Sequence, residues 1–342
     1  MANESNVVQS PQQLLALFQG FMGSAATRAA LDLEVFTHIS HGADTAEKLG
    51  ASKNVSPRAM RILCDALVAF GVLGKTEGRY TLPAPTQMLL VKGSPAYIGA
   101  MARLMVNPMI WNEAGRLTDV VRAGHSLVTA SAEAANNPFW EEFSRNSRQM
   151  AAMAGPSVAD VAAAMFASGV EPKKILDIAA GSGMYGFSAL TRFPNAKLVS
   201  VDWPNVLELA KPTAAHMGLQ HRVEFRPGDI FSVDFGSGYD LVLAVNIYHH
   251  FSIEKCIELS KRLCAATAPG GTIVLVDAIP DEARVENRFA LAFALTMLIW
   301  THEGDTYTLS QYEKMLTAGG YHGVELKAVP GPAPMQAIVA RN

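Results

Sequence analysis

The stretch Ile175-Leu-Asp-Ile-Ala-Ala-Gly-Ser-Gly-Met-Tyr-Gly186 decides the fold of this chain of 342 residues. A short apolar run ends in a glycine-rich turn and passes into a segment of helical character. This order predicts a strand, a tight turn and a helix, the arrangement by which an α/β sheet holds a nucleotide-like ligand at the carboxyl ends of its strands. The turn alone does not select the ligand, because it also fits the dinucleotide-binding pattern G-x-G-x-x-G.

The residues around this turn favour S-adenosylmethionine (SAM) as the ligand, with Asp177 and Asp229 as the acids that discriminate and Asp202 as one that fits NAD equally well. Asp177 lies inside the expected strand, where a buried carboxylate needs a partner such as the ammonium group of a methionine moiety. Asp202 ends the next expected strand, about twenty residues after the turn, where a carboxylate can accept both ribose hydroxyls, as it also does in NAD enzymes. Asp229 follows a third strand and is a candidate acceptor for the adenine amino group, with Ile230 and Phe231 as apolar walls.

Five blocks of sequence in this order carry a family resemblance. They are D-I-A-A-G-S-G, V-D-W-P-N-V, G-D-I-F, Y-H-H-F and A-P-G-G, beginning at Asp177 and ending at Gly271. The chain resembles class I SAM-dependent small-molecule O-methyltransferases of the bacterial secondary-metabolite and plant phenolic type. The resemblance implies an α/β fold with a Rossmann-like seven-stranded sheet, SAM as cofactor and S-adenosylhomocysteine as product.

The resemblance also assigns expected roles to individual residues. His249 matches the family's catalytic base, and Asp277, at the end of the fifth strand, matches an acid that orients that base. His250 stands where the family commonly has Asp, which leaves open which of the two histidines faces the substrate. Thr306 occupies the place of a second family acid. The cofactor contacts expected from the resemblance are Asp177, Ala179, Gly181, Gly183, Asp202, Trp203, Gly228, Asp229, Ile230, Phe231 and Asn246.

The first hundred residues predict a separate helical module. Pro11 to Ile39 reads as helical with apolar residues on one face, Ser56 to Phe70 as a helix with Pro57 at its first position, and Val72 to Leu82 as a small β-wing. This outline is that of a winged helix, and so of a DNA-binding regulator. Arg58 and Arg61 are the only basic residues of the second helix, which is too few for a DNA-recognition helix, so the composition argues against binding to nucleic acid. The resemblance implies a dimerisation domain at 1–100, whose apolar helices pack against a second copy of the chain.

Helices are expected to follow at 101–165 and to roof the substrate pocket, with the SAM-binding domain at 166–342. The 101–165 segment is rich in Met and aromatic residues, and Met suits an adaptable apolar site. Phe143, Met150 and Met153 are its candidate substrate contacts, together with His250. Near the end of the chain, 323–327 and 336–340 are expected to close the sheet as an antiparallel edge pair.

Composition is that of a cytoplasmic enzyme. The chain is 49% apolar and its net charge is -3, which gives no general attraction to nucleic acid or to an anionic membrane. The three cysteines form no C-x-x-C pattern and are expected to be buried and reduced. The N-terminus lacks the pattern of a signal peptide, and the longest apolar stretch, 289–300, is too short to span a bilayer. The histidines show no metal-ligand spacing, so no metal is expected.

The function predicted is methylation of a hydroxyl group on an aromatic or polyketide-like small molecule. A phenol has a pKa of about 10, so a histidine base that removes its proton would accelerate the reaction. C-methylation, N-methylation and a SAM-binding enzyme with a non-methylating reaction remain alternatives. An NAD-dependent dehydrogenase is favoured only by the literal glycine pattern. The identity of the acceptor is left open.

Overall fold

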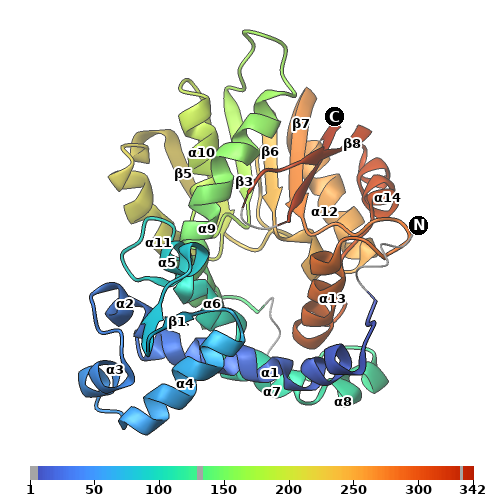
Figure 1. Cartoon of the computed structure of the whole chain (residues 1–342). Coiled ribbons are helices and arrows are strands. Elements are labelled where there is room, and N and C mark those ends of the chain that lie inside the picture. The colour runs from blue at the N-terminus through green and yellow to red at the C-terminus, as the bar shows by residue number, and fades with distance from the viewer. Residues whose placement is uncertain (1–6, 129–133, 332–333) are drawn as a thin grey trace. The chain divides into compact units, whose positions relative to one another are not determined.

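A computed structural model describes residues 7–128, 134–331 and 334–342 of the chain. Its internal contacts divide the chain into two units, Met1–Trp111 and Asn112–Asn342. Figure 1 shows both units, with the first in blue to cyan and the second from green to red. The helix α7 (Pro108–Ala114) spans the boundary between them.

The N-terminal unit is helical with one small hairpin. Ser56 caps α4 through its hydroxyl, and the hairpin turns at Glu77 and Gly78, which both have positive φ, as a tight hairpin requires. Its core includes Phe36, Leu49 and Met60. Its elements are α1 (Pro11–Asp32), α2 (Val35–Ser40), α3 (Ala46–Lys53), α4 (Pro57–Ala69), β1 (Gly74–Thr76), β2 (Arg79–Thr81), α5 (Ala84–Leu90) and α6 (Gly99–Met105).

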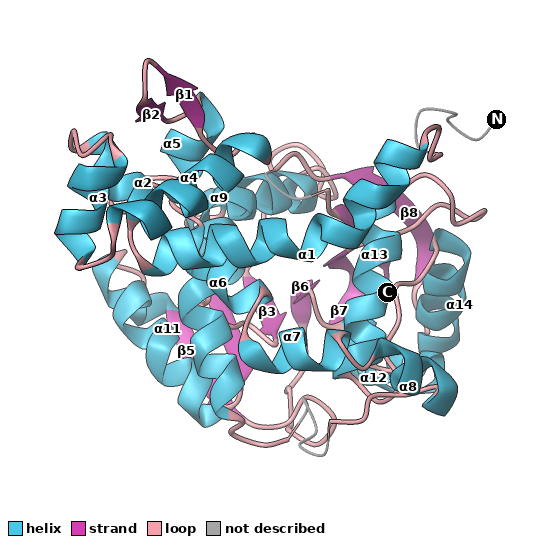
Figure 2. Ribbon diagram, turned by 60° about the horizontal axis from the view of Figure 1, so that its bottom comes forward, coloured by secondary structure: helices cyan, strands magenta, loops and turns pink. Residues whose placement is uncertain are grey.

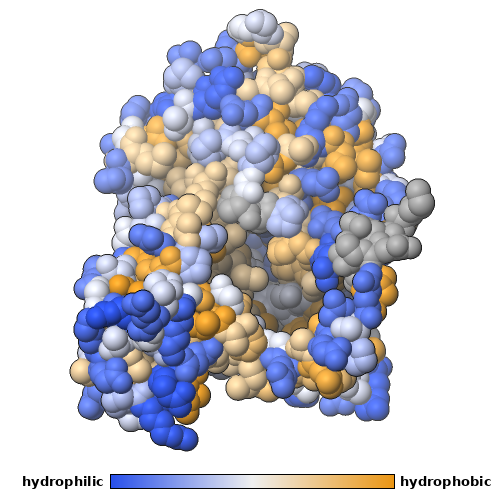
Figure 3. Space-filling model, viewed as in Figure 1, coloured by the Kyte–Doolittle hydropathy of each residue, from blue (hydrophilic) through white to orange (hydrophobic). Residues whose placement is uncertain are grey.

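One face of α1 presents large apolar side chains to the exterior. Leu17 and Phe18 are 66% and 69% exposed, and the other members are Leu14, Leu15, Phe21 and Met22. In Figure 3, hydrophilic residues cover the part of this unit that contains α3, and hydrophobic residues appear beside them. A contiguous exposed apolar face is typical of a protein–protein contact.

The C-terminal unit alternates strands and helices. Its first helices are α8 (Leu117–Ala123) and α9 (Pro138–Ala163). The parallel part follows with β3 (Lys174–Ile178), α10 (Met184–Arg192), β4 (Lys197–Asp202), α11 (Pro204–His216), β5 (Val223–Pro227), β6 (Tyr239–Val245), α12 (Ile253–Ala266) and β7 (Thr267–Asp277). It ends with α13 (Arg288–Trp300), α14 (Leu309–Gly319), β8 (His322–Ala328) and β9 (Gln336–Arg341); two short 3₁₀ turns are η2 (Gln220–Arg222) and η3 (Tyr248–His250).

Seven strands form one sheet in the order β5-β4-β3-β6-β7-β9-β8. The first five run parallel, while β9 pairs antiparallel with both β7 and β8, so β9 is an interior strand and β8 an edge. The strand order reverses at β3, between β4 and β6. Ligands of open α/β sheets bind at the carboxyl ends of the strands beside such a reversal.

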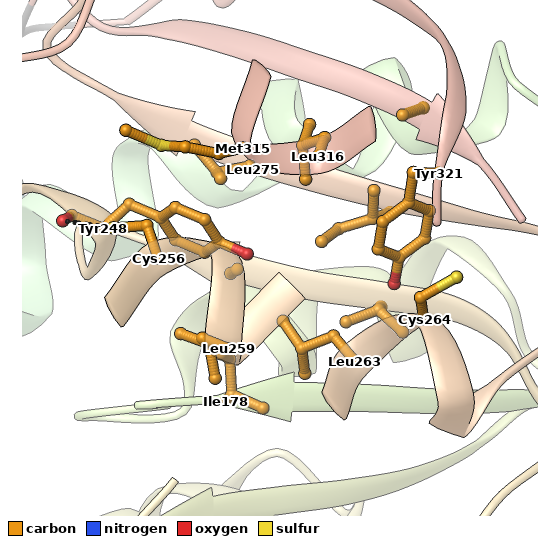
Figure 4. Packing of buried hydrophobic residues seen from close by; sticks show 14 of the residues in the cluster. Ile178, Tyr248, Cys256, Leu259, Leu263, Cys264, Leu275, Met315, Leu316 and Tyr321 are labelled. Carbon is orange, nitrogen blue, oxygen red and sulfur yellow. Dashed lines mark hydrogen bonds between the residues drawn. The ribbon is translucent and has the colours of Figure 1, made fainter. Parts of the chain in front are cut away.

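Helices cover both faces of the sheet, because side chains alternate along each strand. On one face Leu176 and Ile178 of β3 pack with residues of α12 and α14, and on the other Ile175 packs with α9, α10 and α11. Figure 2 shows strands of the sheet between α11 on one side and α12 and α14 on the other. Figure 4 shows the first of these cores, in which Leu259 and Leu263 of α12 lie beside Ile178.

The predicted fold class is confirmed, with local differences. The helix expected over 11–39 is divided into α1 and α2 by Glu34, whose φ of 51° is left-handed and ends the helical path. The strand expected from Thr272 begins at Thr267, because Thr267 already pairs with Tyr239 of β6; the Pro269-Gly-Gly segment lies inside β7 at a register shift, before pairing resumes at Thr272. All three cysteines are free and buried, as expected. Among the described residues, no helix is long and apolar enough to cross a membrane.

Candidate active site

The glycine turn after β3 has the backbone shape that a close-approaching ligand needs. Gly181 and Gly183 have positive φ, and a Cβ atom on Gly181 would meet nothing within 4 Å. Gly183 caps α10, and a Cβ there would lie 2.3 Å from the Phe187 ring, so only glycine fits. Ala179 holds a φ of 49°, which is unusual for a residue with a side chain. The turn therefore leaves open space at Gly181, next to the amino end of a helix.

Asp177 lies under this turn as a buried carboxylate. Asp177 is only 1% exposed, and its Oδ2 atom accepts a hydrogen bond from the amide of Gly186 at 3.1 Å. Burial raises its pKa to about 8, with the negative charge of Asp202 as a second raising influence and the Gly186 amide opposing them. A cation placed beside Asp177 would favour its charged form.

Asp202 joins the end of β4 to the glycine turn. Its Oδ2 atom accepts from the amide of Gly181, and its Oδ1 atom accepts from the amide of Trp203, both at 2.7 Å. Burial raises the pKa of Asp202 to about 6, and the two amides oppose that shift. Its carbonyl oxygen accepts from the amide of Gly228 at 3.0 Å, which brings a third loop to the same edge of the sheet.

That third loop contains Asp229 and its apolar neighbours. Oδ1 of Asp229 accepts from the amide of Phe231 at 2.9 Å, which fixes the turn after β5. Gly228 has a φ of 156°, and a Cβ there would lie 2.8 Å from Val233. Ile230 is buried, and the Phe231 ring packs edge-on against Phe251 with ring centres 4.9 Å apart. A carboxylate and two apolar walls thus stand together at the end of β5.

Asn246 follows β6 on the other side of the strand reversal. Its φ of 56° is left-handed, and its amide donates to the carbonyl of Val276 at 2.9 Å. Its side chain hydrogen-bonds to the hydroxyl of Tyr185, whose pKa rises to about 12, chiefly through burial and then through the charge of Asp177. Tyr185 lies in the glycine stretch, and no sequence pattern predicts its contact with Asn246, which joins the segments after the neighbouring strands β3 and β6.

His249 and Asp277 form a buried pair at the ends of β6 and β7. Their exposed fractions are 4% and 0%, and Nδ1 of His249 lies 2.6 Å from Oδ1 of Asp277. The carboxylate can only accept, so we assign the hydrogen to Nδ1, which leaves the Nε2 lone pair to accept a proton. The amide of Ala278 also donates to Oδ1, at 2.8 Å. Such a pair is suited to general-base chemistry.

Aromatic rings surround the two histidines. The ring of His249 packs against Phe293 at 5.0 Å and against His250 at 4.7 Å, and His250 packs edge-on against Trp140 at 5.3 Å. Burial, followed by the neighbouring His249, lowers the pKa of His250 well below its usual value, so His250 stays neutral. Phe143 stacks edge-on against Trp140 in α9. Met150 and Met153 lie further along α9, both partly buried.

Two contacts of this site were missed from sequence. The hydroxyl of Tyr312 in α14 donates to Oδ2 of Asp277 at 2.9 Å. Gly304 lies against the histidine turn so closely that a Cβ would be 2.3 Å from the carbonyl oxygen of His249. Thr306, at the expected place of a family acid, donates its hydroxyl to the carbonyl of Ala290 at 3.2 Å. Neither Tyr312 nor Gly304 carries a sequence signal, since the tertiary fold makes both contacts.

Two further observations concern metal binding and a surface depression away from these residues. Over the described ranges 7–128, 134–331 and 334–342, no group of His, Cys, Asp and Glu residues is arranged to hold a metal ion. A depression of about 410 Å³ lies at the opposite, amino-terminal ends of β3, β4 and β5. Its lining includes Lys174 and Arg222, which bond to backbone carbonyls, so both cations have structural roles there.

Comparison with known proteins follows the same division of the chain. A family model described as the O-methyltransferase domain matches residues 122–322, and one described as the O-methyltransferase dimerisation domain matches residues 15–92. Mouse acetylserotonin O-methyltransferase is 27% identical over 93% of this chain and 86% of its own length. The tetracenomycin polyketide synthesis 8-O-methyl transferase TcmO of Streptomyces glaucescens is 26% identical over 95% of both chains.

Solved structures agree. A Nostoc punctiforme protein, solved as a candidate O-methyltransferase, is 34% identical, with a TM-score of 0.90 over 98% of this chain and all of that one. Human N-acetylserotonin methyltransferase, solved with SAM, shares the fold at 24% identity, with a TM-score of 0.84 and coverage of 99% of both chains. From the matched domains and the similarity along its full length, this chain belongs to the O-methyltransferase family.

Proposed function

We propose that this enzyme transfers a methyl group from SAM to a hydroxyl oxygen of an aromatic or polyketide-like small molecule. The observation that carries the proposal is the 2.6 Å contact between Nδ1 of His249 and Oδ1 of Asp277, at the same edge of the sheet as the glycine turn. Family membership supports methyl transfer to oxygen. Relatives named for tetracenomycin, a naphthoate and mitomycin support the acceptor class.

The residues at the strand ends fit SAM. Asp177 is buried, and within the described part of the chain its carboxyl group accepts from the amide of Gly186 and contacts no cation, which suits the ammonium group of the methionine part. We expect Asp202 to accept ribose hydroxyls through its remaining lone pairs and Asp229 to accept from the adenine amino group; the amides that hold the two carboxylates support this assignment. The open space at Gly181 admits the ligand. The remaining proposed cofactor contacts are Ala179, Gly183, Trp203, Gly228, Ile230, Phe231 and Asn246.

His249 is the proposed general base. SAM supplies an electrophilic methyl group, so the protein's task is to align the acceptor and to remove its proton. Nε2 of His249 accepts the hydroxyl proton as the acceptor oxygen gains its new bond, and Asp277 stabilises the imidazolium that forms. General-base catalysis of this kind contributes about 10²–10⁴-fold. Burial of the pair excludes water that would weaken the interaction.

The acceptor is proposed to lie against the rings near His249. Phe143, Met150, Met153 and neutral His250 are the proposed contacts, and Trp140 and Phe293 join them because their rings pack against the histidines. A wall of neutral aromatic groups suits a planar, uncharged ring system.

The same observations weigh against the other reaction classes. Methylation of carbon or nitrogen, or a reaction without methyl transfer, does not by itself require a base tied to a buried carboxylate, and family membership favours oxygen. An NAD-dependent dehydrogenase has no use for Asp177 beneath the turn. A DNA-binding regulator needs a basic recognition helix, whereas α4 presents exposed Ile62 and lacks a run of basic residues.

We also infer a homodimer formed through the N-terminal unit. The match to a dimerisation domain and the exposed apolar face of α1 support it. The proposed domains are a dimerisation domain at residues 1–100, a helical segment at 101–165 that roofs the substrate pocket, and a SAM-binding domain at 166–342. A cytoplasmic location stays a prediction from composition.

The decisive experiment compares His249→Ala with wild type. We expect His249→Ala to bind S-adenosylhomocysteine with unchanged affinity by calorimetry and to lose about 10²–10⁴-fold in turnover. Turnover is measured with isotope-labelled SAM against a panel of neutral polycyclic phenols. His322→Ala, an exposed change on the edge strand, is the matched control. Wild-type turnover by His249→Ala would overturn the assignment of the base.

A further inference from the structure

Tyr312 connects the C-terminal helix α14 to the buried carboxylate of the histidine pair. It is fully buried, and its hydroxyl lies 2.9 Å from Oδ2 of Asp277, a residue 35 positions earlier in the chain. Oδ1 of Asp277 receives Nδ1 of His249 and the amide of Ala278, while Oδ2 receives Tyr312 and the amide of His249. Each carboxylate oxygen therefore has two donors.

We propose that Tyr312 is a positioning residue for the methyl-transfer reaction, because its hydroxyl holds Asp277 in the orientation that keeps Oδ1 on Nδ1 of His249. The inference rests on the proposed function, in which His249 is the base. It adds a residue that acts through Asp277 and lies in α14, a different element from the turn η3 that carries both histidines.

The hydroxyl of Tyr312 is fixed as the donor. An ionised carboxylate has only acceptor sites, so the shared hydrogen lies on the tyrosine oxygen. Burial, and then the charge of Asp277, raise the pKa of Tyr312 well above its usual value, so this hydrogen is retained. The contact is therefore a charge-assisted hydrogen bond, the stronger class of such bonds.

Removal of this donor would leave Oδ2 weakly held. Its other donor is the amide of His249 at 3.3 Å, a long contact compared with the 2.9 Å bond from Tyr312. A buried carboxylate oxygen that loses a donor costs free energy, and a rotation of the carboxylate toward another donor lowers that cost. Rotation of Asp277 would loosen the bond to Nδ1 of His249 and admit the other tautomer, whose Nε2 atom carries a hydrogen and cannot accept a proton.

Tyr312 is itself held firmly. Its ring packs against Tyr248, 6.2 Å away in the histidine turn, and edge-on against Tyr307 at 6.0 Å. A capping box formed by Thr308 and Gln311 starts the helix one turn earlier. Tyr307 in turn donates its hydroxyl to the carbonyl of Phe251, after the second histidine. The helix, the turn and the carboxylate are therefore one packed assembly.

Figure 4 shows the core that supports this assembly. Met315 and Leu316 of α14 lie there with Leu275 of β7, the strand that ends in Asp277. Tyr321 lies in the same core, is 1% exposed, and bonds through its hydroxyl to Thr267 at 2.8 Å. Tyr321 thus matches Tyr312 in size and burial and in having one buried hydrogen bond through its hydroxyl, but its partner is Thr267 and not the histidine pair.

The test compares Tyr312→Phe with Tyr321→Phe in the full chain. We expect Tyr312→Phe to lose about 10–100-fold in kcat, by analogy with the partners that orient metal-bound histidines, with KM for SAM unchanged. We expect Tyr321→Phe to keep kcat within about twofold, since it removes a comparable buried hydroxyl away from the site. Thermal unfolding of both variants shows whether their stabilities fall by similar amounts.

A second readout does not depend on turnover. In protein labelled with 15N-histidine, we expect the proton on Nδ1 of His249 to give a downfield signal in wild type and in Tyr321→Phe. In Tyr312→Phe this signal should move upfield or broaden as the second tautomer is populated. If Tyr312→Phe fails to fold, 3-fluorotyrosine at position 312 keeps the shape but changes the donor, and it should shift the same signal.

The two proposals fail in different ways. An unchanged Nδ1 signal and unchanged kcat in Tyr312→Phe would overturn the role of Tyr312 and leave His249 as the base. If His249→Ala retains full turnover, the proposed base is wrong, and a changed Nδ1 signal in Tyr312→Phe would still show that Tyr312 positions Asp277. If the signal also stays unchanged, both proposals are wrong.

Discussion

The Oδ2 atom of Asp177 lies 3.1 Å from the amide nitrogen of Gly186, the residue that closes the glycine stretch on the first turn of α10. A Cβ atom at position 186 would lie 2.6 Å from the same oxygen, so the helix can approach the carboxylate only as glycine. One amide is little compensation for a buried charge, and burial raises the pKa of Asp177 to about 8.

This raised pKa predicts a pH-dependent affinity for S-adenosylhomocysteine. Below the pKa of about 8 the ligand-free enzyme holds Asp177 as a neutral acid, whereas an ammonium partner requires the carboxylate. The affinity should therefore rise by up to about tenfold per pH unit as pH increases toward that value. It should fall again at higher pH, where the α-amino group of the ligand, which is that of a free amino acid, loses its proton. Calorimetric titration across this range measures both limbs.

Asp177→Asn is the control for that titration. The amide keeps the acceptor for Gly186 but has no titratable proton. We expect weaker binding and loss of the rising limb in this variant. A rising limb of the same slope in Asp177→Asn would assign the pH dependence to another group.

The ligand-free enzyme should lose stability as pH rises. A carboxyl group whose pKa is raised in the folded state favours unfolding once the pH exceeds its unfolded value of about 3.9, and the penalty grows until the folded pKa is passed. The folded values are about 6 for Asp202 and about 8 for Asp177. We expect the free energy of unfolding to decline between these limits and Asp177→Asn to flatten the decline. Chemical denaturation at several pH values measures it, and a rise in stability over that window would contradict the prediction.

Gly304→Ala should disturb the histidine turn. The added methyl group would lie 2.3 Å from the carbonyl oxygen of His249 and 2.4 Å from the hydroxyl oxygen of Thr301, so backbone must move. Because a displacement of about 1 Å in a reacting group can cost about 10²-fold, we expect kcat to fall by one to two orders of magnitude with S-adenosylhomocysteine affinity unchanged. Gly331→Ala is the control, since its Cβ would make an ordinary contact at 3.8 Å. Equal kcat in the two variants would mean that the turn tolerates the shift.

Charge on α1 should dissociate the proposed dimer. Leu17 and Phe18 are 66% and 69% exposed, so Glu at both positions leaves the core of the unit intact but places two charges in an apolar contact. We expect the double variant to sediment as a monomer at a concentration where wild type is dimeric. Gln12→Glu, on the same helix, adds one charge at an exposed polar position as a control. A dimeric double variant would place the contact elsewhere.

The sequence predicted most of what depends on local pattern. The glycine turn, the acids that end β4 and follow β5, and the strand that ends at Asp277 all come from short apolar runs that stop at a polar residue. His249 and Asp277 were predicted as a pair only through family resemblance, because 28 residues separate them.

Contacts made by packing could not be predicted in the same way. From the sequence, Tyr312 is an ordinary buried position of an amphipathic helix. Only the packing of α14 brings its hydroxyl to Asp277, where it donates a hydrogen bond. From the sequence, Gly304 is an ordinary loop glycine. The structure shows that the backbone of the histidine turn occupies the space that a side chain at position 304 would need. The sequence predicts the start of β7 at Thr272, five residues after its observed start at Thr267, because proline and glycine usually mark loops whereas Pro269-Gly-Gly lies within this strand.

The interior position of β9 has a consequence for how the enzyme is made. Residues 336–341 insert between β7 and β8, and the side chain of Asn342 donates to the carbonyls of Cys264 and Thr267. Synthesis on the ribosome proceeds from the amino terminus, so the N-terminal unit can fold while the sheet still lacks one of its inner strands. Until residue 341 has emerged, β7 lacks a partner on one side and β8 lacks its only partner, and such unpaired strands are the parts of a sheet most able to pair with another chain.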